Sequence, residues 1–451
     1  MNNLLLIIYF LLCLIFSTVI SPQIVPRLSV GGASVSLTDF LFIFFVGCIF
    51  ISRLMHKNES VPARSYSIVL MIIFIGVGVI GFFNGIFSKD VGINLAVREG
   101  RNFFLYLVFF IYLGLSLDGK NVNRVVNILL ILACLTSFFS ILEASGVVER
   151  IPFIAGKIKT LTTGGEEMAG VTRVSLPGVS VINFAFFILF FQLSQKISVL
   201  RLSLMLLVSL GFFLSFNRGA WLSTILAMVS VFFFLPPLLK KQVAIKGFIV
   251  FFLALLLFVG GLSGIMGGRV KTYLDAGTDR FATMTVAGMQ EDNSFMGRFE
   301  ESRILLEKLK NRPVLGFGLG ALTQRVTWGK EGNKESLRSY ETGYAHNGYV
   351  YLTYKLGILG LLAFLLLFVY FSVKSLKMIK RLKDPEIGAI YVASVGFVIS
   401  IVPHSLVNPR NMEGKWIIII ASAMALSHLC LSVDALASRK IQGGISNDII
   451  K

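Results

Sequence analysis

The chain has 451 residues, of which 55% are hydrophobic, 12% aromatic and only 15% charged. Soluble domains are nearer about 45–50% apolar and about 25% charged, so the composition excludes a soluble globule and indicates a polytopic membrane protein. A formal net charge of +18 would suggest nucleic acid as the partner of a soluble protein. In a membrane protein the basic residues report orientation instead, and we expect no nucleic-acid partner.

About twelve apolar runs are long enough, at about 17 to 25 residues, to cross a bilayer as helices. The first run lacks a basic leader and an A-x-A cleavage pattern, so we interpret it as a retained helix. The expected fold is therefore all-α. In chain order, we expect spans at 4–21, 38–53, 66–84, 101–117, 124–143, 177–195, 198–216, 218–235, 246–264, 347–371, 387–403 and 415–433.

Orientation follows from the distribution of Lys and Arg over the short loops. Basic residues are more frequent in the loops that share a side with both termini, which predicts cytoplasmic termini and outward-facing long loops. We expect nine spans within 1–264, with an outward loop at 144–176. A large outward loop follows at 265–346, and 347–451 holds three spans and a cytoplasmic tail.

The large loop contains a helical pattern in "GRFEESRILLEKLKNRPVLGFGLG". Ile304, Leu305 and Leu309 lie near helical spacing, and Pro313 with the following glycines predicts the stop. We therefore expect a partly folded cap. The segment "GFGLG" lacks G-x-G-x-x-G spacing and follows a helix rather than a strand, so we interpret it as a flexible exit from the loop helix.

Arg218 is the polar residue that most strongly indicates a functional site. It lies in the turn "SFNRGAWLS" between two long apolar stretches. One interpretation is an arginine whose charged group reaches the interface and anchors a helix end. The other is a phosphate-binding guanidinium, because its planar fork matches phosphate oxygens. Gly219 would allow a ligand to approach the backbone.

His346 and Asn347 precede an apolar helix in "AHNGYV". A histidine at a helix start is often an interfacial polar residue. With an unperturbed pKa near about 6.5, a histidine is also able to accept a proton at neutral pH. Both interpretations are open from this motif alone.

Three motifs in order, "FNRGAWLS", "GRFEESRILLEKLKNRPVLGFGLG" and "AHNGYVYLTYKLGILGLL", resemble the O-antigen ligase and polymerase superfamily of bacterial envelope glycosyltransferases. The resemblance covers residues 211 to 367. It implies a GT-C type membrane fold and a glycan donor on undecaprenyl pyrophosphate, with neither a metal nor a cofactor. It also implies an active site on the periplasmic side of the bacterial inner membrane.

The resemblance implies three catalytic residues. Arg218 and Arg298 correspond to arginines that would hold the pyrophosphate and stabilise its charge as it leaves. His346 corresponds to the histidine of the H-N pair, which would accept a proton from the incoming hydroxyl or orient it. Attack from the opposite face would invert the anomeric carbon.

Five further residues are candidates for substrate binding: Asn347, Arg173, Arg303, Lys355 and His404. Lys355 departs from the family, which often has a carboxylate there. It would form a swapped ion pair, contact phosphate, or simply reach the interface. His404 would be structural or would line the acceptor cleft.

Three functions are open from the sequence. We favour polymerisation of lipid-linked repeat units, because a second outward loop carrying Arg173 offers a further basic surface for glycan. The alternative is a ligase that transfers glycan to the lipid A core, and a chain-length regulator is a further candidate partner. A transporter or flippase is disfavoured, because the halves do not mirror each other and the polar candidates lie near outer helix ends.

Overall fold

The structure is a computed structural model, and it describes most of the chain. It is mostly helical, with three short antiparallel hairpins. The described residues are 2–17, 27–30, 33–55, 66–88, 90–113, 118–145, 157–163, 166–175, 178–247, 293–331 and 334–448, with isolated positions between 249 and 278. The elements are α1 Asn2–Ser17, β1 Arg27–Val30, β2 Ala33–Ser36, α2 Leu37–Met55, α3 Tyr66–Phe87, α4 Ile93–Phe104, η1 Leu105–Leu113, α5 Gly119–Ser145, β3 Lys157–Thr163, β4 Glu166–Ser175, α6 Val179–Gln195, α7 Val199–Leu214, α8 Arg218–Phe234, α12 Asn293–Leu309, β5 Thr323–Glu331, β6 Lys334–Thr342, α13 Gly348–Met378, η3 Ile379–Arg381, α14 Pro385–His404 and α15 Gly414–Asp448.

Five described helices, α3, α5, α13, α14 and α15, are long and apolar enough to cross a membrane. Five shorter apolar helices, α1, α2, α6, α7 and α8, accompany them. Each of these ten helices overlaps one predicted span, as expected where a lipid environment requires every backbone group to be bonded within its own segment. The predicted span 246–264 lies largely outside the described residues, so the number of twelve stays a prediction.

The predicted span 101–117 differs from the structure. The helix begins earlier, at the start of α4, and continues as the 3-10 helix η1 rather than as one straight α-helix. α4 carries the charged stretch around Glu99, and Arg101 contacts Asp39 at 3.4 Å. These charges need polar partners, so α4 is a polar helix ahead of the apolar η1.

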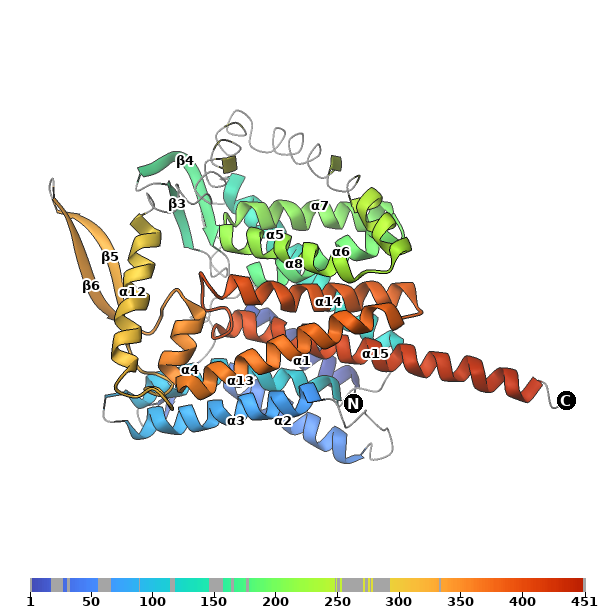
Figure 1. Cartoon of the computed structure of the whole chain (residues 1–451), viewed down its shortest axis with the longest axis horizontal. Coiled ribbons are helices and arrows are strands. Elements are labelled where there is room, and N and C mark those ends of the chain that lie inside the picture. The colour runs from blue at the N-terminus through green and yellow to red at the C-terminus, as the bar shows by residue number, and fades with distance from the viewer. Residues whose placement is uncertain are drawn as a thin grey trace.

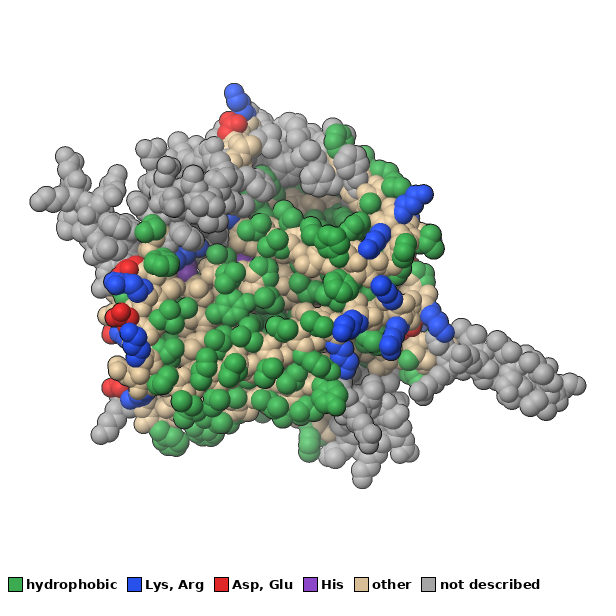
Figure 2. Space-filling model, viewed as in Figure 1, with side chains coloured by type: hydrophobic (Ala, Val, Ile, Leu, Met, Phe, Trp, Pro, Cys, Tyr) green, Lys and Arg blue, Asp and Glu red, His purple; other side chains and the backbone are tan. Residues whose placement is uncertain are grey.

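Most of the long helices run in roughly the same direction (Figure 1), and their two ends differ in charge (Figure 2). At one end, Arg124 donates to Asn3 (3.3 Å), and the backbone of Lys383 donates to Asp434 (3.1 Å). We name this the basic end, and we name the opposite end, which holds α12 and the hairpins β3–β4 and β5–β6, the hairpin end. Figure 2 shows Lys and Arg side chains at the basic end, a band of hydrophobic side chains across the middle, and mixed acidic and basic side chains at the hairpin end.

α14 forms the centre of one half of the structure, packed against α6, α8 and α15. Its first turn is capped by Asp384, whose carboxylate accepts from the backbone of Glu386 (2.8 Å) and Ile387 (3.1 Å). Small residues allow close helix packing in a membrane. At Gly396, for example, an added Cβ would lie 3.0 Å from the Phe187 ring. α14 therefore places its last residue rigidly at the hairpin end.

α13 is broken at Gly357, whose backbone has φ 67° and ψ −171°. The break frees helical N–H and C=O groups, and the segment after α12 bonds them. Ile358 donates its N–H to the Pro313 carbonyl (2.9 Å), and Phe317 donates to the Tyr354 carbonyl (2.9 Å). An exchange of this kind is needed because unpaired backbone groups are costly inside a membrane protein.

The segment "GFGLG" lies against α3, α4 and α13. Gly318 donates to the Lys355 carbonyl (2.9 Å) and has a positive φ of 88°, and a Cβ added there would lie 2.3 Å from the Gly85 nitrogen. A Cβ added at Gly320 would lie 2.4 Å from the Ala96 nitrogen. The predicted flexible exit is therefore wrong, because the glycines serve close backbone packing at positive φ.

Three antiparallel hairpins were not predicted from the sequence: β1–β2, β3–β4 and β5–β6. The last two lie in the predicted outward loops, and β5–β6 joins the "GFGLG" segment to the start of α13. The helix expected in the large loop is present as α12. The large loop is thus a folded unit of one helix and one hairpin in its described part.

Replacing Gly318 by alanine is expected to destabilise the folded protein by about 2 kcal/mol or more, because the side chain would meet backbone at a strained φ. Thermal unfolding of the detergent-solubilised protein would show a lower Tm and a smaller folded yield. Gly76→Ala is the control, because a Cβ at Gly76 meets no described atom within 4 Å. Equal Tm values for the two variants would contradict the close-packing argument.

Candidate active site

Four segments meet at the hairpin end of the helices. The start of α8 and the turn between α14 and α15 come from one half of the structure, and α12 and the start of α13 come from the other. Contacts connect the segments that carry the sequence motifs.

His346 is bound by Glu301 of α12. The Nδ1 atom of His346 lies 2.8 Å from Glu301 Oε2, and the backbone N–H of His346 donates to the same oxygen (3.1 Å). Glu301 is 1% exposed, whereas the His346 side chain is 15% exposed. An ionised carboxylate can only accept. Glu301 therefore fixes the imidazole orientation and places its proton on Nδ1.

Asn347 begins α13 as its N-cap. Its side-chain oxygen accepts from the backbone of Tyr349 (3.0 Å) and Val350 (3.2 Å), which satisfies the first N–H groups of the helix. The next residue, Gly348, donates its N–H to the Ser405 carbonyl in the α14–α15 turn (2.7 Å). The H-N pair is thus held between α12 and that turn.

Arg298 and Arg303 lie on different faces of α12. Arg298 precedes Glu301 by three residues, so both side chains lie on the face toward His346. Arg303 lies roughly 200° around the helix from Glu301. Its side chain is 62% exposed and pairs with Glu300 at 2.5 Å. Arg298 therefore shares the Glu301 face of α12 and lies within electrostatic range of Tyr344, whereas Arg303 points to another side of the helix.

Arg218 is the first residue of α8 and follows a strained turn. Phe216 has a positive φ of 45°, which is uncommon for a bulky residue and is typical of functional sites. Asn217 caps α8 by accepting from Ala220 (3.2 Å). A Cβ at Gly219 would lie 3.2 Å from the His404 ring, so this turn packs directly on the end of α14.

His404 lies at the end of α14 and is fully buried. Arg410 donates from Nε to His404 Nε2 (3.2 Å), and the His404 ring packs edge-on against Trp416 with centroids 4.9 Å apart. Because a guanidinium can only donate, Nε2 accepts and the proton of His404 is on Nδ1. His404 therefore orients Arg410, next to the turn that carries Arg218.

Glu413 holds the other side of Arg410. Its carboxylate accepts from Arg410 Nη1 (2.8 Å) and lies 3.3 Å from Lys415 Nζ. Burial raises the pKa of Glu413, but the charges of Arg410 and Lys415 outweigh it and hold the pKa below its ordinary value. Glu413 is therefore ionised at neutral pH, and two cations share one carboxylate.

Tyr344 lies between these groups. Its ring is 5.3 Å from the His346 ring, and its hydroxyl lies 3.4 Å from the Asn408 side chain. Burial, and after it the charge of Glu413, raise the pKa of Tyr344 above its ordinary value, and the charges of Arg410 and then Arg298 act in the opposite sense. Tyr344 is therefore an un-ionised hydroxyl among charged groups.

Several buried polar atoms at this end have no hydrogen-bond partner within the described residues. They are Glu301 Oε1, His404 Nδ1, Ser405 Oγ and Asn411 Oδ1. Their residues contact His346, Arg410 or Gly348 through other atoms. Buried polar atoms are nearly always bonded, so a gathering of such atoms is typical of a site that binds water or a polar ligand.

Two further sequence candidates are Lys355 and Arg173. Lys355 is fully buried and pairs with Glu99 at 2.7 Å, which is the swapped ion pair among the alternatives open from the sequence. Arg173 lies in β4, where it is paired with Lys159 of β3. The side chain of Arg173 lies outside the described part of the chain.

Sequence reasoning missed Glu301, Tyr344 and Glu413. Glu301 lies in the same helical motif as Arg298, three residues later, and this spacing is a signal for one shared face. Tyr344 stands two residues before His346, with no pattern that marks it. No sequence pattern marks Glu413, because its role depends on packing next to Arg410.

Acidification is expected to weaken the Arg410–Glu413–Lys415 cluster. A carboxylate with a lowered folded-state pKa contributes stability that is present above its unfolded pKa and lost as pH falls through the folded value. The Tm difference between the wild type and Glu413→Gln should therefore be largest near neutral pH and should shrink below about pH 4.5. A difference that stays constant down to acid pH would contradict this assignment.

These features define a multi-pass membrane protein with a cation-rich polar site at one end of its helices. Residues 203–365 match the family model described as O-antigen ligase. The matched region includes Arg218, Arg298 and His346. Residues 203–365 are thus similar to the O-antigen ligase family, and this match supports the resemblance drawn from the three motifs. No curated protein matches the chain.

Proposed function

We propose that the protein is a membrane glycosyltransferase that polymerises oligosaccharide repeat units linked to undecaprenyl pyrophosphate. The reaction takes place on the periplasmic side of the bacterial inner membrane, which corresponds to the hairpin end. The observation that carries this proposal is a carboxylate-bound His346 whose ring lies beside Tyr344, within electrostatic range of which lie Arg298, Arg410 and Glu413. The O-antigen ligase family supports the same class of chemistry.

The charge at this end suits a pyrophosphate leaving group. Among the charged residues assigned to the candidate site, cationic side chains outnumber carboxylates by two, and a pyrophosphate diester carries two negative charges. Guanidinium groups grip such oxygens through paired hydrogen bonds and need no metal to do so. The cations are Arg218, Arg298, Arg410 and Lys415, and the carboxylates are Glu301 and Glu413.

His346 supplies the proton acceptor in this proposal. With Nδ1 donating to Glu301, Nε2 is the basic nitrogen of the ring. Nε2 takes the proton of the acceptor hydroxyl while that oxygen bonds to the anomeric carbon. The bond from that carbon to the phosphate oxygen breaks on the opposite face, and its electron pair leaves with the pyrophosphate. The transfer inverts the anomeric carbon.

The hairpins β3–β4 and β5–β6 favour polymerisation. Both lie at the same end of the molecule as α12 (Figure 1), in the two segments predicted as outward loops. Two projecting elements suit a reaction in which donor and acceptor are both glycans. A ligase that transfers glycan to the lipid A core is the second candidate, favoured by the description of the matching family.

Purified protein in detergent tests the enzymatic proposal. With lipid-linked repeat units and no proton gradient, it is expected to form longer lipid-linked glycans, with loss of activity in His346→Ala. Conversion in detergent excludes a transporter that acts without chemistry. Failure of the wild type to convert any lipid-linked glycan, alone or with a lipid A-core acceptor, would overturn the glycosyltransferase assignment.

A complementation experiment in cells distinguishes a polymerase from a ligase. In a knockout complemented with the His346→Ala variant, a polymerase defect leaves a single repeat unit attached to the lipid A core. A ligase defect removes all attached glycan and accumulates lipid-linked polymer. Gel analysis of envelope glycan distinguishes these patterns, and membrane levels of the variant must match those of the wild type.

A further inference from the structure

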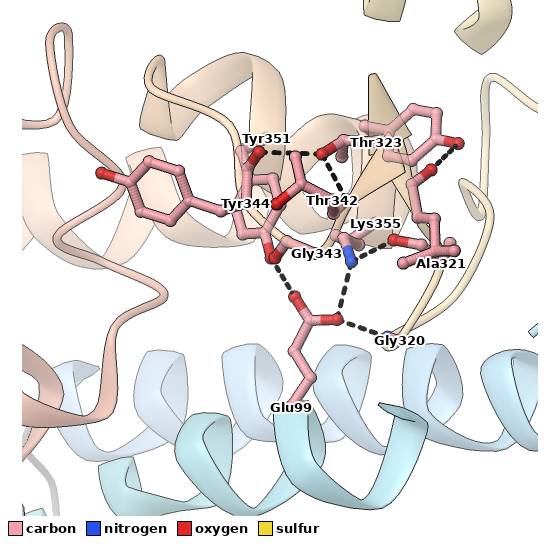
Figure 3. Close-up of polar contacts among 11 residues, drawn as sticks. Glu99, Gly320, Ala321, Thr323, Thr342, Gly343, Tyr344, Tyr351 and Lys355 are labelled. Atoms are coloured by element: carbon pink, nitrogen blue, oxygen red, sulfur yellow. Dashed lines mark hydrogen bonds and ion pairs between the residues drawn. The ribbon is translucent and has the colours of Figure 1, made fainter. Parts of the chain in front are cut away.

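A second polar cluster joins α4 to the first part of α13 (Figure 3). It consists of Glu99, Tyr351 and Lys355. The Lys355 side chain is 0% exposed and that of Glu99 is 13% exposed. Lys355 Nζ lies 2.7 Å from Glu99 Oε2, and the Tyr351 hydroxyl lies 2.5 Å from Glu99 Oε1. This cluster adjoins the candidate active site, because Tyr344 and Glu413 lie within electrostatic range of Tyr351.

The same three side chains bind backbone groups on either side of the β5–β6 hairpin. Before β5, the N–H of Gly320 donates to Glu99, and Lys355 Nζ donates to the Ala321 carbonyl (2.5 Å). After β6, the Tyr351 hydroxyl lies 2.6 Å from the Gly343 carbonyl (Figure 3). Both ends of the hairpin are therefore attached to α4 and α13.

This attachment is close to the proposed catalytic residue along the chain. Gly343 precedes His346 by three residues, and Thr323 bonds the same segment, with its hydroxyl 2.8 Å from the Thr342 carbonyl and 2.9 Å from the Tyr344 carbonyl. Movement of Gly343 would therefore shift the residues that lead to the imidazole. The cluster therefore holds at Gly343 the same segment that Glu301 binds at His346.

The charges of the pair match the backbone groups that they bind. A backbone N–H can only donate and a carbonyl can only accept, so Gly320 needs an acceptor and Ala321 needs a donor. Glu99 and Lys355 supply them in that order. A reversed pair would keep the mutual attraction but would set an ammonium against the N–H and a carboxylate against the carbonyl, leaving both unsatisfied.

We propose that Glu99, Lys355 and Tyr351 are positioning residues that hold the two ends of the β5–β6 hairpin, and through Gly343 the His346 segment, in the arrangement needed for transfer. The direction of the Glu99–Lys355 pair is set by the two backbone groups it binds. This inference rests on the proposed function only for its consequence in catalysis. Its structural part stands independently.

Tyr351→Phe tests the hold on Gly343 with the smallest change, because it removes only the hydroxyl. We expect faster amide hydrogen exchange across residues 343–346 and a kcat reduced about 10-fold to 10²-fold, as for a catalytic group displaced by about 1 Å. KM for the lipid-linked donor should stay within two-fold. Tyr349→Phe is the matched control, because Tyr349 donates to Val402 of α14 (2.7 Å) and not to the hairpin.

Charge reversal tests the direction of the pair. The double variant Glu99→Lys with Lys355→Glu retains an ion pair, and we expect it to remain as defective in kcat and in exchange at residues 320–323 as either single variant. Wild-type values in the double variant would overturn the proposal, since an ordinary ion pair would then suffice. If reversal prevents folding, the comparison of Tyr351→Phe with Tyr349→Phe still decides the question.

The exchange measurement separates this inference from the proposed function. If the wild type transfers no glycan, the proposed function fails, but exchange at residues 343–346 still reports the hold. If transfer occurs and Tyr351→Phe leaves both exchange and kcat at the level of Tyr349→Phe, the positioning role is overturned while the proposed function stands.

Discussion

His346→Ala is expected to reduce glycan transfer by about 10²-fold to 10⁴-fold, the usual contribution of a general base. Without the imidazole, the acceptor hydroxyl loses the group that takes its proton, while the cations that bind the donor stay in place. KM for the lipid-linked donor should therefore change little. Turnover of a purified lipid-linked glycan in detergent measures both quantities, and size-exclusion profiles check that the variant is folded.

Two further variants distinguish proton acceptance by His346 from a role in orienting the hydroxyl. His346→Gln can orient a hydroxyl but cannot accept its proton, so substantial residual activity would contradict the general-base assignment. Glu301→Gln should cause a smaller loss. The backbone N–H of His346 can only donate, so the amide oxygen must stay at the Oε2 position and continue to accept from Nδ1. That variant therefore removes the charge and retains the orientation.

Arg298→Ala is expected to lower kcat by about 10²-fold to 10³-fold, the usual cost of removing one group that stabilises transition-state charge. The reason is that negative charge grows on the pyrophosphate as the sugar leaves. Arg298→Lys should recover part of the rate, because lysine retains the charge but lacks the planar fork. Single-turnover rates with a saturating donor isolate this step from binding.

Arg303→Ala is the matched control on the same helix. Its side chain is exposed and paired with Glu300, on the face of α12 away from Glu301. We expect its kcat to stay within about two-fold of the wild type. Equal losses for Arg298→Ala and Arg303→Ala would show that charge on α12 acts at long range, and would remove the argument for direct contact between Arg298 and the leaving group.

The two polar clusters at the hairpin end bind different parts of the chain near His346. Glu301 and the α14–α15 turn bind the H-N pair directly. Glu99 and Lys355 bind the backbone that carries the hairpin into the same pair. In the proposed function, a catalytic group whose segment is bonded at two points needs little reorganisation when the substrate arrives, which is the condition for effective electrostatic catalysis.

Local patterns in the sequence determined where most of the apolar helices lie and which residues are candidates for the site. The apolar runs predicted ten of the described helices, because a hydrocarbon environment admits only long segments that satisfy their own backbone. The three motifs predicted Arg218, Arg298 and His346 as one group. The helix predictions succeeded because each depends on residues close together in the chain, whereas the grouping of the three site residues stays a prediction.

Only the tertiary structure decided how distant residues meet. Glu301 and His346 are 45 positions apart, and Glu99 and Lys355 are 256 apart. No local period predicts such pairs, because they depend on which helix ends pack together. The close packing of "GFGLG" is of the same kind. Its glycines resemble a loop in the sequence, but they occupy positive φ because the backbone of three helices leaves no room for a side chain.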